Sequence, residues 1–447
     1  MQVEWWGTLP FVVMLLSIAI VPLVPKLAGW WSHPRAQLTV ALALGLPVAL
    51  WVMVAGHSHL VGHALQEYLG FICLIGSLFV ITGGIHLAGD IRATPRNNTL
   101  FLAIGALIAS VVGTTGAAML LIRPILNTNK EREHASHTIV YAIFLVANCG
   151  GLLTPLGDPP LFLGLMRGVP FTWTLTLLPQ WAFVNGLLLA SYYCLDRAMF
   201  AREDAPHRLQ DQTDITPLKL LGTHNFVWLA GVVAAVAVVP SPWRDVVMVG
   251  CALGSWLTTS HEVRHTLNEF SWAPIAEVAA IFLGIFTTMV PALQYLDEIA
   301  PKLPLDEITF FLFSGGLSSV LDNAPTYATF FELASHLPGD PRVAGVPEAY
   351  LIAISLGAVC CGAMTYIGNG PNFMVRSVAE QHGRPMPSFG GYIVWSVREL
   401  APVLAAMVLL FIADATWAKA LGAVVTVGII VVALYRARGT SHVRDAV

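Results

Sequence analysis

Long apolar stretches follow one another along almost the whole chain of 447 residues. An α-helix needs about 20 mostly apolar residues to cross the hydrocarbon core of a bilayer. The stretches that fit this requirement are 8–25, 37–55, 68–88, 172–195, 225–240, 244–258, 273–292, 400–413 and 417–435. Only 11% of the residues are charged, whereas soluble domains have about 25%. The sequence therefore predicts an all-α, polytopic integral membrane protein in contact with membrane lipid.

Several other classes of protein are excluded or disfavoured. The net charge of −4 leaves no basic field for phosphate polymers, so we expect no nucleic-acid partner. The six cysteines lie in apolar stretches, and none has the C-x-x-C spacing of zinc sites or redox motifs. Neither a P-loop nor a nucleophile elbow is present in the sequence. These features disfavour an ATP-driven pump or a membrane-bound enzyme, and we expect no enzymatic activity and no cofactor.

Four apolar regions are interrupted in a way that a simple membrane-spanning helix is not. Regions 99–122 and 308–335 carry small polar residues in their middle and are predicted to be re-entrant hairpins. Regions 138–168 and 349–380 contain Gly, Pro and polar residues and are predicted to be broken helices. Irregular backbone is stable at membrane depth only where it is buried in protein or lines a wet cavity. The four interruptions are therefore expected to meet near the middle of the bilayer.

The distribution of Lys and Arg predicts the orientation, because cytoplasmic loops carry an excess of these residues. This rule predicts that hairpin 99–122 enters the membrane from the cytoplasm and that hairpin 308–335 enters it from the outside. It also predicts a multi-pass protein of the cell inner membrane, with the N-terminus outside and the C-terminus in the cytoplasm. Segment 385–399 is either an amphipathic interfacial helix or the beginning of the next span. The predicted units are a first membrane repeat (1–195), a cytoplasmic linker (196–222), a second membrane repeat with a C-terminal helix (223–435) and a cytoplasmic tail (436–447).

An internal repeat relates the two halves. Segments 153–162 and 364–373 share Thr, Gly, an Asp or Asn, Pro and Phe at matching places, with an offset of 211 residues (365 − 154). The hairpin tips 113–117 and 322–326 have nearly the same offset, 209 residues (322 − 113). Because the two hairpins are predicted to enter from opposite sides, this is an inverted-topology repeat, as in many secondary transporters.

Carboxylates stand in or near these interruptions. Asp158 lies in the first broken helix and Asp322 on the second hairpin tip. Intramembrane carboxylates are costly and usually mark ion or proton paths, so both are candidates for ion binding and proton relay. Either Asp could instead cap the N-terminus of a helix. Glu277, inside an apolar helix, is either a third relay carboxylate or an interfacial residue paired with Arg264 or His265.

Neutral oxygen donors surround these carboxylates in the sequence. Hard cations prefer oxygen ligands over nitrogen or sulfur, although Ser and Thr also commonly satisfy backbone groups. The candidate sodium ligands are Asp322, Asn323 and Thr115. The further candidates for ion or substrate binding are Thr114, Asn148, Thr154, Ser318, Ser319, Thr326, Thr365, Asn369 and Asn372.

These same segments resemble the ion transporter superfamily, which includes arsenite permeases, citrate and dicarboxylate carriers and D-type sodium/proton antiporters. Residues 113–124, 148–158 and 318–326 are similar to the antiporter branch and to the citrate-transporter-like branch beside it. The resemblance implies a homodimer, with a scaffold part and a transport part in each protomer. It also implies alternating access by an elevator-like movement of the transport part.

The hairpin tips depart from one pattern of this superfamily. Sodium-coupled dicarboxylate members carry Ser-Asn-Thr at both tips, whereas this chain has 113–116 (Gly-Thr-Thr-Gly) and 322–326 (Asp-Asn-Ala-Pro-Thr). A negative charge on Asp322 disfavours a polyanionic substrate and favours a cation. We therefore expect a sodium (or lithium)/proton antiporter. The alternative is a sodium- or proton-coupled transporter of citrate, another carboxylate or an anion such as arsenite.

Overall fold

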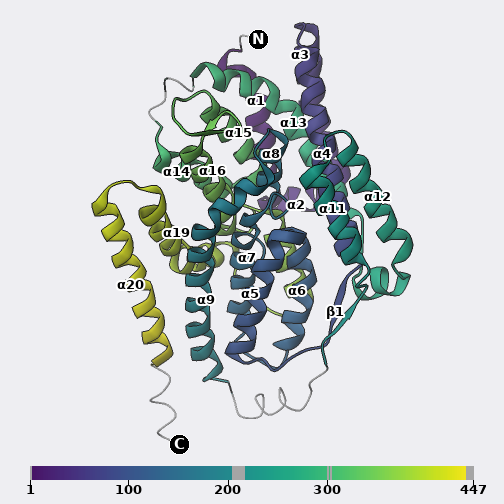
Figure 1. Cartoon of the computed structure of the whole chain (residues 1–447). Coiled ribbons are helices and arrows are strands. Elements are labelled where there is room, and N and C mark those ends of the chain that lie inside the picture. Colours follow the sequence, from purple (N-terminus) through teal and green to yellow (C-terminus); the bar gives the residue numbers. More distant parts are fainter. Residues whose placement is uncertain (1–2, 204–216, 300–301, 303–304, 439–447) are drawn as a thin grey trace, which may run out of the picture.

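A computed structural model describes residues 3–203, 217–299, 302 and 305–438 (Figure 1). Residues 204–216 of the expected linker 196–222 and residues 439–447 of the expected tail 436–447 lie outside the described residues. The described part is mostly helical with very few strand residues, and seven of its helical segments are long and apolar enough to cross a membrane. The predicted all-α, polytopic membrane fold is therefore confirmed.

The helices of both halves have the following bounds. The first half contains α1 (Leu9–Ile20), α2 (Pro25–Trp31), α3 (Pro34–Val54), α4 (Ser58–Thr82), β1 (His86–Ala88), α5 (Pro95–Val112), α6 (Thr114–Thr128), α7 (Ser136–Leu145), α8 (Pro159–Met166) and α9 (Leu178–Phe200). The second half contains β2 (Lys219–Leu221), α11 (Asn225–Val238), α12 (Trp243–Thr258), α13 (Ala273–Ile299), α14 (Glu307–Ser318), α15 (Asn323–Ser335), β3 (Arg342–Val343), β4 (Val346–Pro347), α16 (Glu348–Cys361), α17 (Gly370–Gln381), α18 (Phe389–Trp395), α19 (Ala401–Met407) and α20 (Thr416–Arg438). Short 3-10 helices are Trp5–Thr8, Val21–Leu23, Cys149–Leu153, Phe171–Leu177 and Gly362–Met364, and π-helical turns are Glu262–Leu267, Ser396–Leu400 and Val408–Ile412.

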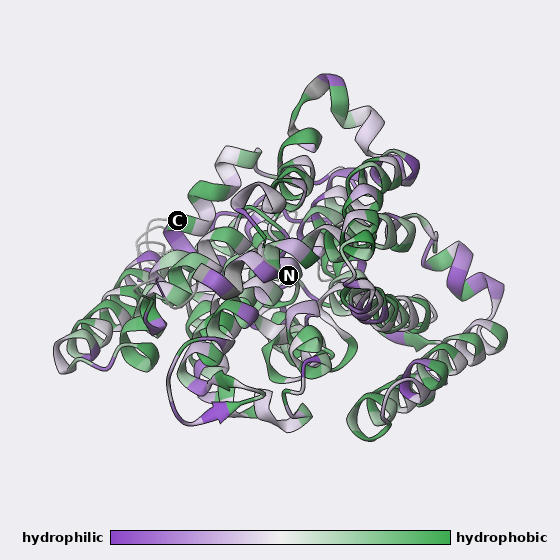
Figure 2. Cartoon of the chain, turned by 90° about the horizontal axis from the view of Figure 1, so that it is seen from above, coloured by the Kyte–Doolittle hydropathy of each residue, from purple (hydrophilic) through white to green (hydrophobic). Residues whose placement is uncertain are grey.

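The helices form two main groups around the interrupted elements. In one group α3 and α4 pack against α13, and α11 and α12 pack against α4. In the other group α9 packs against α5 and α20. The short strands β1 and β2 pair antiparallel and join the two halves of the chain. Most of the helices at the periphery are largely hydrophobic (green in Figure 2), as expected for helices that face lipid.

The two hairpins approach each other from opposite ends of the molecule. Helices α5 and α6 lie in the lower part of Figure 1, whereas α14 and α15 lie in the upper part. Gly113 turns the first tip with φ 85° and ψ 149°, a conformation that favours glycine. The first hairpin runs from Pro95 to Thr128 and is longer than the predicted 99–122, because Thr94 caps α5 by accepting from the Asn97 amide at 3.2 Å. Which side of the membrane each hairpin faces stays a prediction.

Within the segment 385–399, residues 389–399 begin a helix that is long and apolar enough to cross a membrane. Helical residues continue without a gap from Phe389 to Ile412, through π-helical turns. The alternative of a separate interfacial helix is therefore wrong. In the two regions predicted to be broken helices, α7 and α8 flank the first interruption, and α16 and α17 flank the second.

Close glycine contacts hold both interruptions in shape. A methyl group at Gly157 would collide with the carbonyl oxygen of Gly151. A methyl group at Gly368 would lie 2.5 Å from the carbonyl oxygen of Gly362 and 2.6 Å from that of Ser318. Backbone atoms cannot move aside as a flexible side chain can, so only glycine fits at these two places.

This packing predicts a contrast between neighbouring glycines. Gly157→Ala and Gly368→Ala are expected to lower the midpoint of thermal unfolding in detergent, since each forces two backbone segments apart. Gly370→Ala is the matched control, because a methyl group there meets no atom within 4 Å. The control should change the free energy of unfolding by no more than about 0.5 kcal/mol. Equal effects of Gly368→Ala and Gly370→Ala would contradict this account of the interruptions.

Candidate ion-binding site

All four interruptions meet at the carboxylate of Asp158. This residue precedes α8 and is only 1% exposed. Its Oδ1 accepts a hydrogen bond from Thr114 Oγ1 at 2.7 Å, at the tip of the first hairpin. Its Oδ2 accepts from Asn323 Nδ2 at 2.5 Å, at the tip of the second hairpin, and Oδ1 also lies 3.3 Å from Asn369 Nδ2 in the second interruption. The structure thus brings Asp158 together with Asn369, which is 211 positions away in the chain.

The donors to Asp158 are neutral. One is a hydroxyl and two are amides, and within the described part of the chain no Lys, Arg or His forms an ion pair with this carboxylate. An ionised carboxylate without a countercharge costs several kcal/mol when it is buried. In addition, Asn323 Oδ1 is buried without a hydrogen-bond partner beside it. The arrangement therefore has one unsatisfied negative charge and one unsatisfied neutral oxygen, which a proton or a small cation can satisfy.

The two aspartates have different local roles. Asp322 caps α15, because its Oδ1 accepts from the amide of Ala324 at 3.1 Å, and its side chain is half-buried. Asp158 occupies the same position before α8 but makes no capping hydrogen bond. Pro159 and Pro160 have no amide hydrogen to donate, and the next amide, that of Leu161, donates to the backbone carbonyl of Asp158 at 3.1 Å. The capping alternative therefore applies to Asp322, and the centre of the site is Asp158.

A chain of asparagine side chains extends the site on the side of the second half. Asn369 Nδ2 donates to Asn148 Oδ1 at 3.1 Å. Asn148 Nδ2 in turn donates to Asn372 Oδ1 at 2.7 Å and to the carbonyl of Ile143 at 2.8 Å. All three asparagines are buried. These amides fix the orientation of Asn369 toward Asp158, so they position the site.

Several predicted ligands instead satisfy backbone carbonyls. Thr365 Oγ1 donates to the carbonyl of Ser319 at 2.5 Å, and Thr154 Oγ1 donates to the carbonyl of Ser110. Thr326 Oγ1 donates to the carbonyl of Asp322 at 3.1 Å. Their hydroxyl protons are therefore used within the irregular backbone, as is common for Ser and Thr.

These contacts also follow the internal repeat. The hydroxyl of Ser110 donates to the carbonyl of Gly150 at 2.5 Å, and that of Ser319 donates to the carbonyl of Cys361 at 3.1 Å. Position 150 plus the offset of 211 is 361, so the two bonds are equivalent. Ser110 was not predicted, although its equivalence to Ser319 at the offset of 209 (319 − 110) could have revealed it.

A small cavity lies directly beside Asp158. Its volume is about 40 Å³, which leaves room for about three water-sized spheres. Thr114 and Thr115 of the first hairpin tip line it, together with apolar residues of α4 such as Leu74 and Leu78. Of the three predicted sodium ligands, Thr115 thus lines the cavity, Asn323 contacts Asp158, and Asp322 caps α15. The cavity matches a small ion in size.

Glu277 belongs to a different part of the structure. It lies half-buried on α13, where its Oε1 accepts from Gln37 Nε2 of α3 at 2.6 Å. Arg264 instead donates to Ser255 and to the carbonyl of Val80. The predicted pairing of Glu277 with Arg264 is therefore wrong, because other acceptors lie closer to the guanidinium. The structure does not bring Glu277 to the contacts around Asp158.

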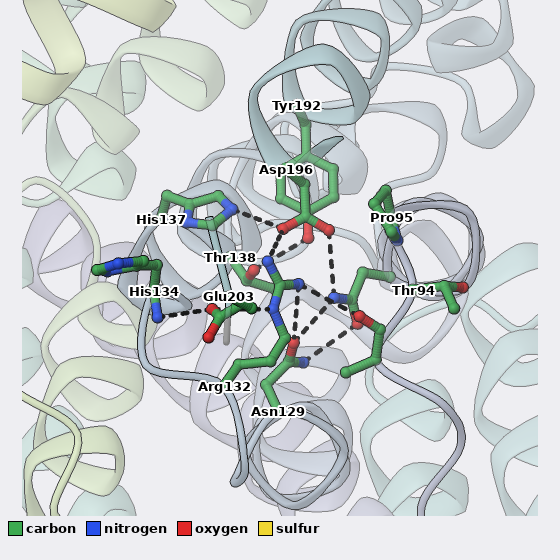
Figure 3. A network of polar contacts seen from close by, with 12 residues as sticks. Thr94, Pro95, Asn129, Arg132, His134, His137, Thr138, Tyr192, Asp196 and Glu203 are labelled. Atoms are coloured by element: carbon green, nitrogen blue, oxygen red, sulfur yellow. Dashed lines mark hydrogen bonds and ion pairs between the residues drawn. The ribbon is translucent and has the colours of Figure 1, made fainter. Parts of the chain in front are cut away.

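A second buried carboxylate provides a contrast with Asp158 (Figure 3). Asp196 Oδ1 lies 2.7 Å from Arg132 Nη2 and 2.8 Å from His137 Nε2. Arg132 Nε also lies 3.6 Å from Glu203. Burial alone would lower the pKa of Arg132, but Asp196 and Glu203 raise this pKa above its ordinary value, so Arg132 stays charged. The sequence analysis did not predict this cluster. In it, Arg132 balances the negative charge of Asp196, whereas no described Lys, Arg or His balances that of Asp158.

Discontinuous helices that meet around a polar site are a feature of many membrane transporters. A family model described as "Putative citrate transport" matches residues 1–412. The chain therefore belongs to this family and is a polytopic membrane transporter.

Individual relatives agree with this class. An uncharacterized transporter of Synechocystis is 22% identical over 415 residues, covering 82% of this chain and 90% of the relative. The inner membrane protein YbiR of Escherichia coli is 24% identical over 268 residues, covering 57% of this chain and 68% of the relative. The P protein of Sus scrofa is 26% identical over 192 residues, which cover 40% of this chain but only 22% of that longer protein.

Proposed function

We propose that this transporter exchanges sodium (or lithium) for protons and that both ions compete for Asp158. One observation carries the proposal: the buried carboxylate has three neutral hydrogen-bond donors and no described cationic partner. Such a group is stable when it holds either a proton or a cation. Ion binding at one site that excludes the other ion is sufficient for exchange when the site alternately faces the two sides.

The ligand set supports a small hard cation. The candidate oxygens come from Asp158 and Thr114, which line the cavity, and from the unpartnered Oδ1 of Asn323, whose Nδ2 donates to Asp158. Carboxylate, hydroxyl and amide oxygens are preferred ligands of hard cations. Asp322, at the tip of the second hairpin, adds a further negative charge near this set and is proposed as a secondary relay group.

The second candidate function is sodium- or proton-coupled transport of a carboxylate such as citrate. The family description favours it. Four helices have their N-terminus at the site, namely α6, α8, α15 and α17. Helix N-termini attract anions. In this candidate Asp158 still binds the coupling ion, but the carboxylate substrate binds next to it.

The resemblance to the ion transporter superfamily supports three further proposals. The protein is a homodimer, it works by an elevator-like movement, and it lies in the inner membrane with its C-terminus in the cytoplasm. The name of the Escherichia coli relative YbiR, an inner membrane protein, supports the proposed membrane.

Transport in vesicles separates the two candidates. The full chain is reconstituted with a pH-sensitive dye inside, and a proton gradient is imposed. For exchange, sodium alone dissipates the gradient in the wild type and in the control variant Asp306→Asn, which keeps a capping residue at the start of α14. Dissipation that requires citrate or another carboxylate would replace exchange by the second candidate. If neither sodium nor a carboxylate moves protons, both candidates are wrong.

A further inference from the structure

A cleft separate from the Asp158 site lies between α9, α20 and the helical segment that continues into α19. Its volume is about 230 Å³. One end carries two arginines and a glutamate, and the rest of the wall is mostly apolar. The lining residues are Ser191, Arg398, Glu399, Pro402, Gly428, Ile429, Val432, Ala433 and Arg436.

A π-helical turn creates the charged end of this cleft. Residues Ser396–Leu400 form the turn, which interrupts the regular helix and contains both Arg398 and Glu399. π-Helical turns of this kind occur frequently at functional sites. Arg436 comes from the last turn of α20 and meets the same glutamate. Two separate helices thus deliver one guanidinium each to the same place.

Glu399 orients both guanidinium groups. Arg398 Nε lies 2.8 Å from Glu399 Oε1, and Arg436 Nη1 lies 2.9 Å from both carboxylate oxygens. Tyr141 OH also donates to Glu399, at 3.1 Å. Two guanidinium charges and one carboxylate leave a net charge of +1 at this end of the cleft. Both oxygens of the Glu399 carboxylate therefore have partners within the protein, whereas one positive charge of the two arginines is not balanced by this carboxylate.

The two arginines also keep N–H groups that do not bind Glu399. A guanidinium has five N–H groups. Among the described residues, Arg398 uses only its Nε and Arg436 only its Nη1 toward protein acceptors. The Arg398 side chain is 52% exposed, and its guanidinium carbon lies 5.5 Å from the ring centre of Trp395. Several N–H groups are thus free to bind an anion from outside the protein.

We propose that this cleft binds an anionic phospholipid. The free N–H groups match the oxygens of a phosphate, which arginine binds in a bidentate manner. The apolar wall formed by Ile429, Val432 and Pro402 matches an acyl chain. Basic pockets between membrane helices are known to hold anionic lipid headgroups. Trp395 and the 78%-exposed Tyr435 beside the arginines are typical of the membrane interface. A free phosphate ion would leave the apolar part of the cleft empty.

The test measures lipid binding to the purified full-length protein. Phosphatidylglycerol is titrated in detergent, with phosphatidylcholine and inorganic phosphate in parallel, and binding is followed by native mass spectrometry and by the thermal unfolding midpoint. We expect phosphatidylglycerol to bind and to raise the midpoint, whereas the other two do not. Arg398→Gln should weaken phosphatidylglycerol binding about tenfold or more. Arg197→Gln, an exposed arginine of α9 outside the cleft, is the matched control and should bind like the wild type.

A second variant distinguishes lipid binding from a purely structural role. Glu399→Gln keeps both arginines but raises the net charge of the cleft, so it should bind phosphatidylglycerol at least as tightly as the wild type. The proposal is overturned if phosphatidylcholine or inorganic phosphate raises the midpoint as much as phosphatidylglycerol does. It is also overturned if Glu399→Gln and Arg398→Gln weaken binding equally, or if Arg398→Gln binds normally.

Discussion

The Asp158→Asn variant is expected to lose sodium-dependent proton movement while it keeps its fold. The substitution removes the only ionisable group at the centre of the described site, where all four interruptions meet. Losing the charged ligand of a buried ion costs about 3 kcal/mol or more, which corresponds to a decrease of about 100-fold. The measurement is dissipation of a proton gradient by sodium in reconstituted vesicles, across a range of sodium concentrations.

We expect the Asp158→Asn variant to keep its fold because the side-chain amide of the neighbouring Asn323 can rotate by half a turn. The introduced carboxamide would accept from Thr114 through its oxygen, as the Asp158 carboxylate does. Its nitrogen would face Asn323, whose own Oδ1 has no hydrogen-bond partner. A rotation of the Asn323 amide then restores a donor–acceptor pair. The thermal unfolding midpoint of the variant should therefore stay close to that of the wild type.

Asp322→Asn is the control for this variant. Asn caps helices about as well as Asp, so α15 should keep its N-terminus. We expect a smaller loss of exchange than in Asp158→Asn, since Asp322 already accepts from the amide of Ala324. Loss of exchange in Asp322→Asn together with normal exchange in Asp158→Asn would reverse the assignment of the two carboxylates.

The Arg132→Met variant is expected to have the largest effect on stability. Removing this guanidinium leaves two buried carboxylates, Asp196 and Glu203, without their arginine partner. Removing one partner of a buried ion pair typically costs about 3–5 kcal/mol. Methionine fills a similar volume, so the cost reflects the lost ion pairs and not a cavity.

Thermal unfolding in detergent measures this effect, with Lys130→Met as the matched control. Lys130 is two residues away and forms ion pairs with Asp90 and Glu131, whose side chains are 9% and 5% exposed, but its own side chain is 52% exposed. Because the Lys130 ammonium group reaches solvent, its loss should lower the unfolding midpoint much less than the loss of the buried Arg132 guanidinium does. A similar decrease in both variants would mean that the charges around Asp196 are not structurally important.

The sequence was sufficient to predict the interruptions because lipid leaves few alternatives. Polar and glycine-rich backbone inside an apolar stretch has no water to bind, so it must meet other protein segments. The offset of 211 residues between Thr154 and Thr365 then indicated which segments are equivalent. The equivalent hydrogen bonds of Ser110 and Ser319 agree with that offset.

Other features could not be predicted in this way. The cluster around Asp196 joins Arg132, His137 and Glu203, whose spacing has no regular pattern and whose contacts depend on how α7 and α9 pack. The partner of Glu277 is Gln37, which is 240 residues distant in the chain. The roles of the two aspartates could not be predicted either, because the sequence allowed each of them to cap a helix or to bind an ion. The structure shows that Asp322 caps α15, whereas Asp158 makes no capping hydrogen bond.

Proton release on sodium binding tests the central claim most directly. The purified protein is mixed with sodium chloride in a weakly buffered detergent solution, and the change in pH is recorded, with choline chloride as the reference salt. If the two ions compete for Asp158, sodium releases protons from the wild type and from Asp306→Asn but releases none from Asp158→Asn. Undiminished proton release by Asp158→Asn would contradict the account.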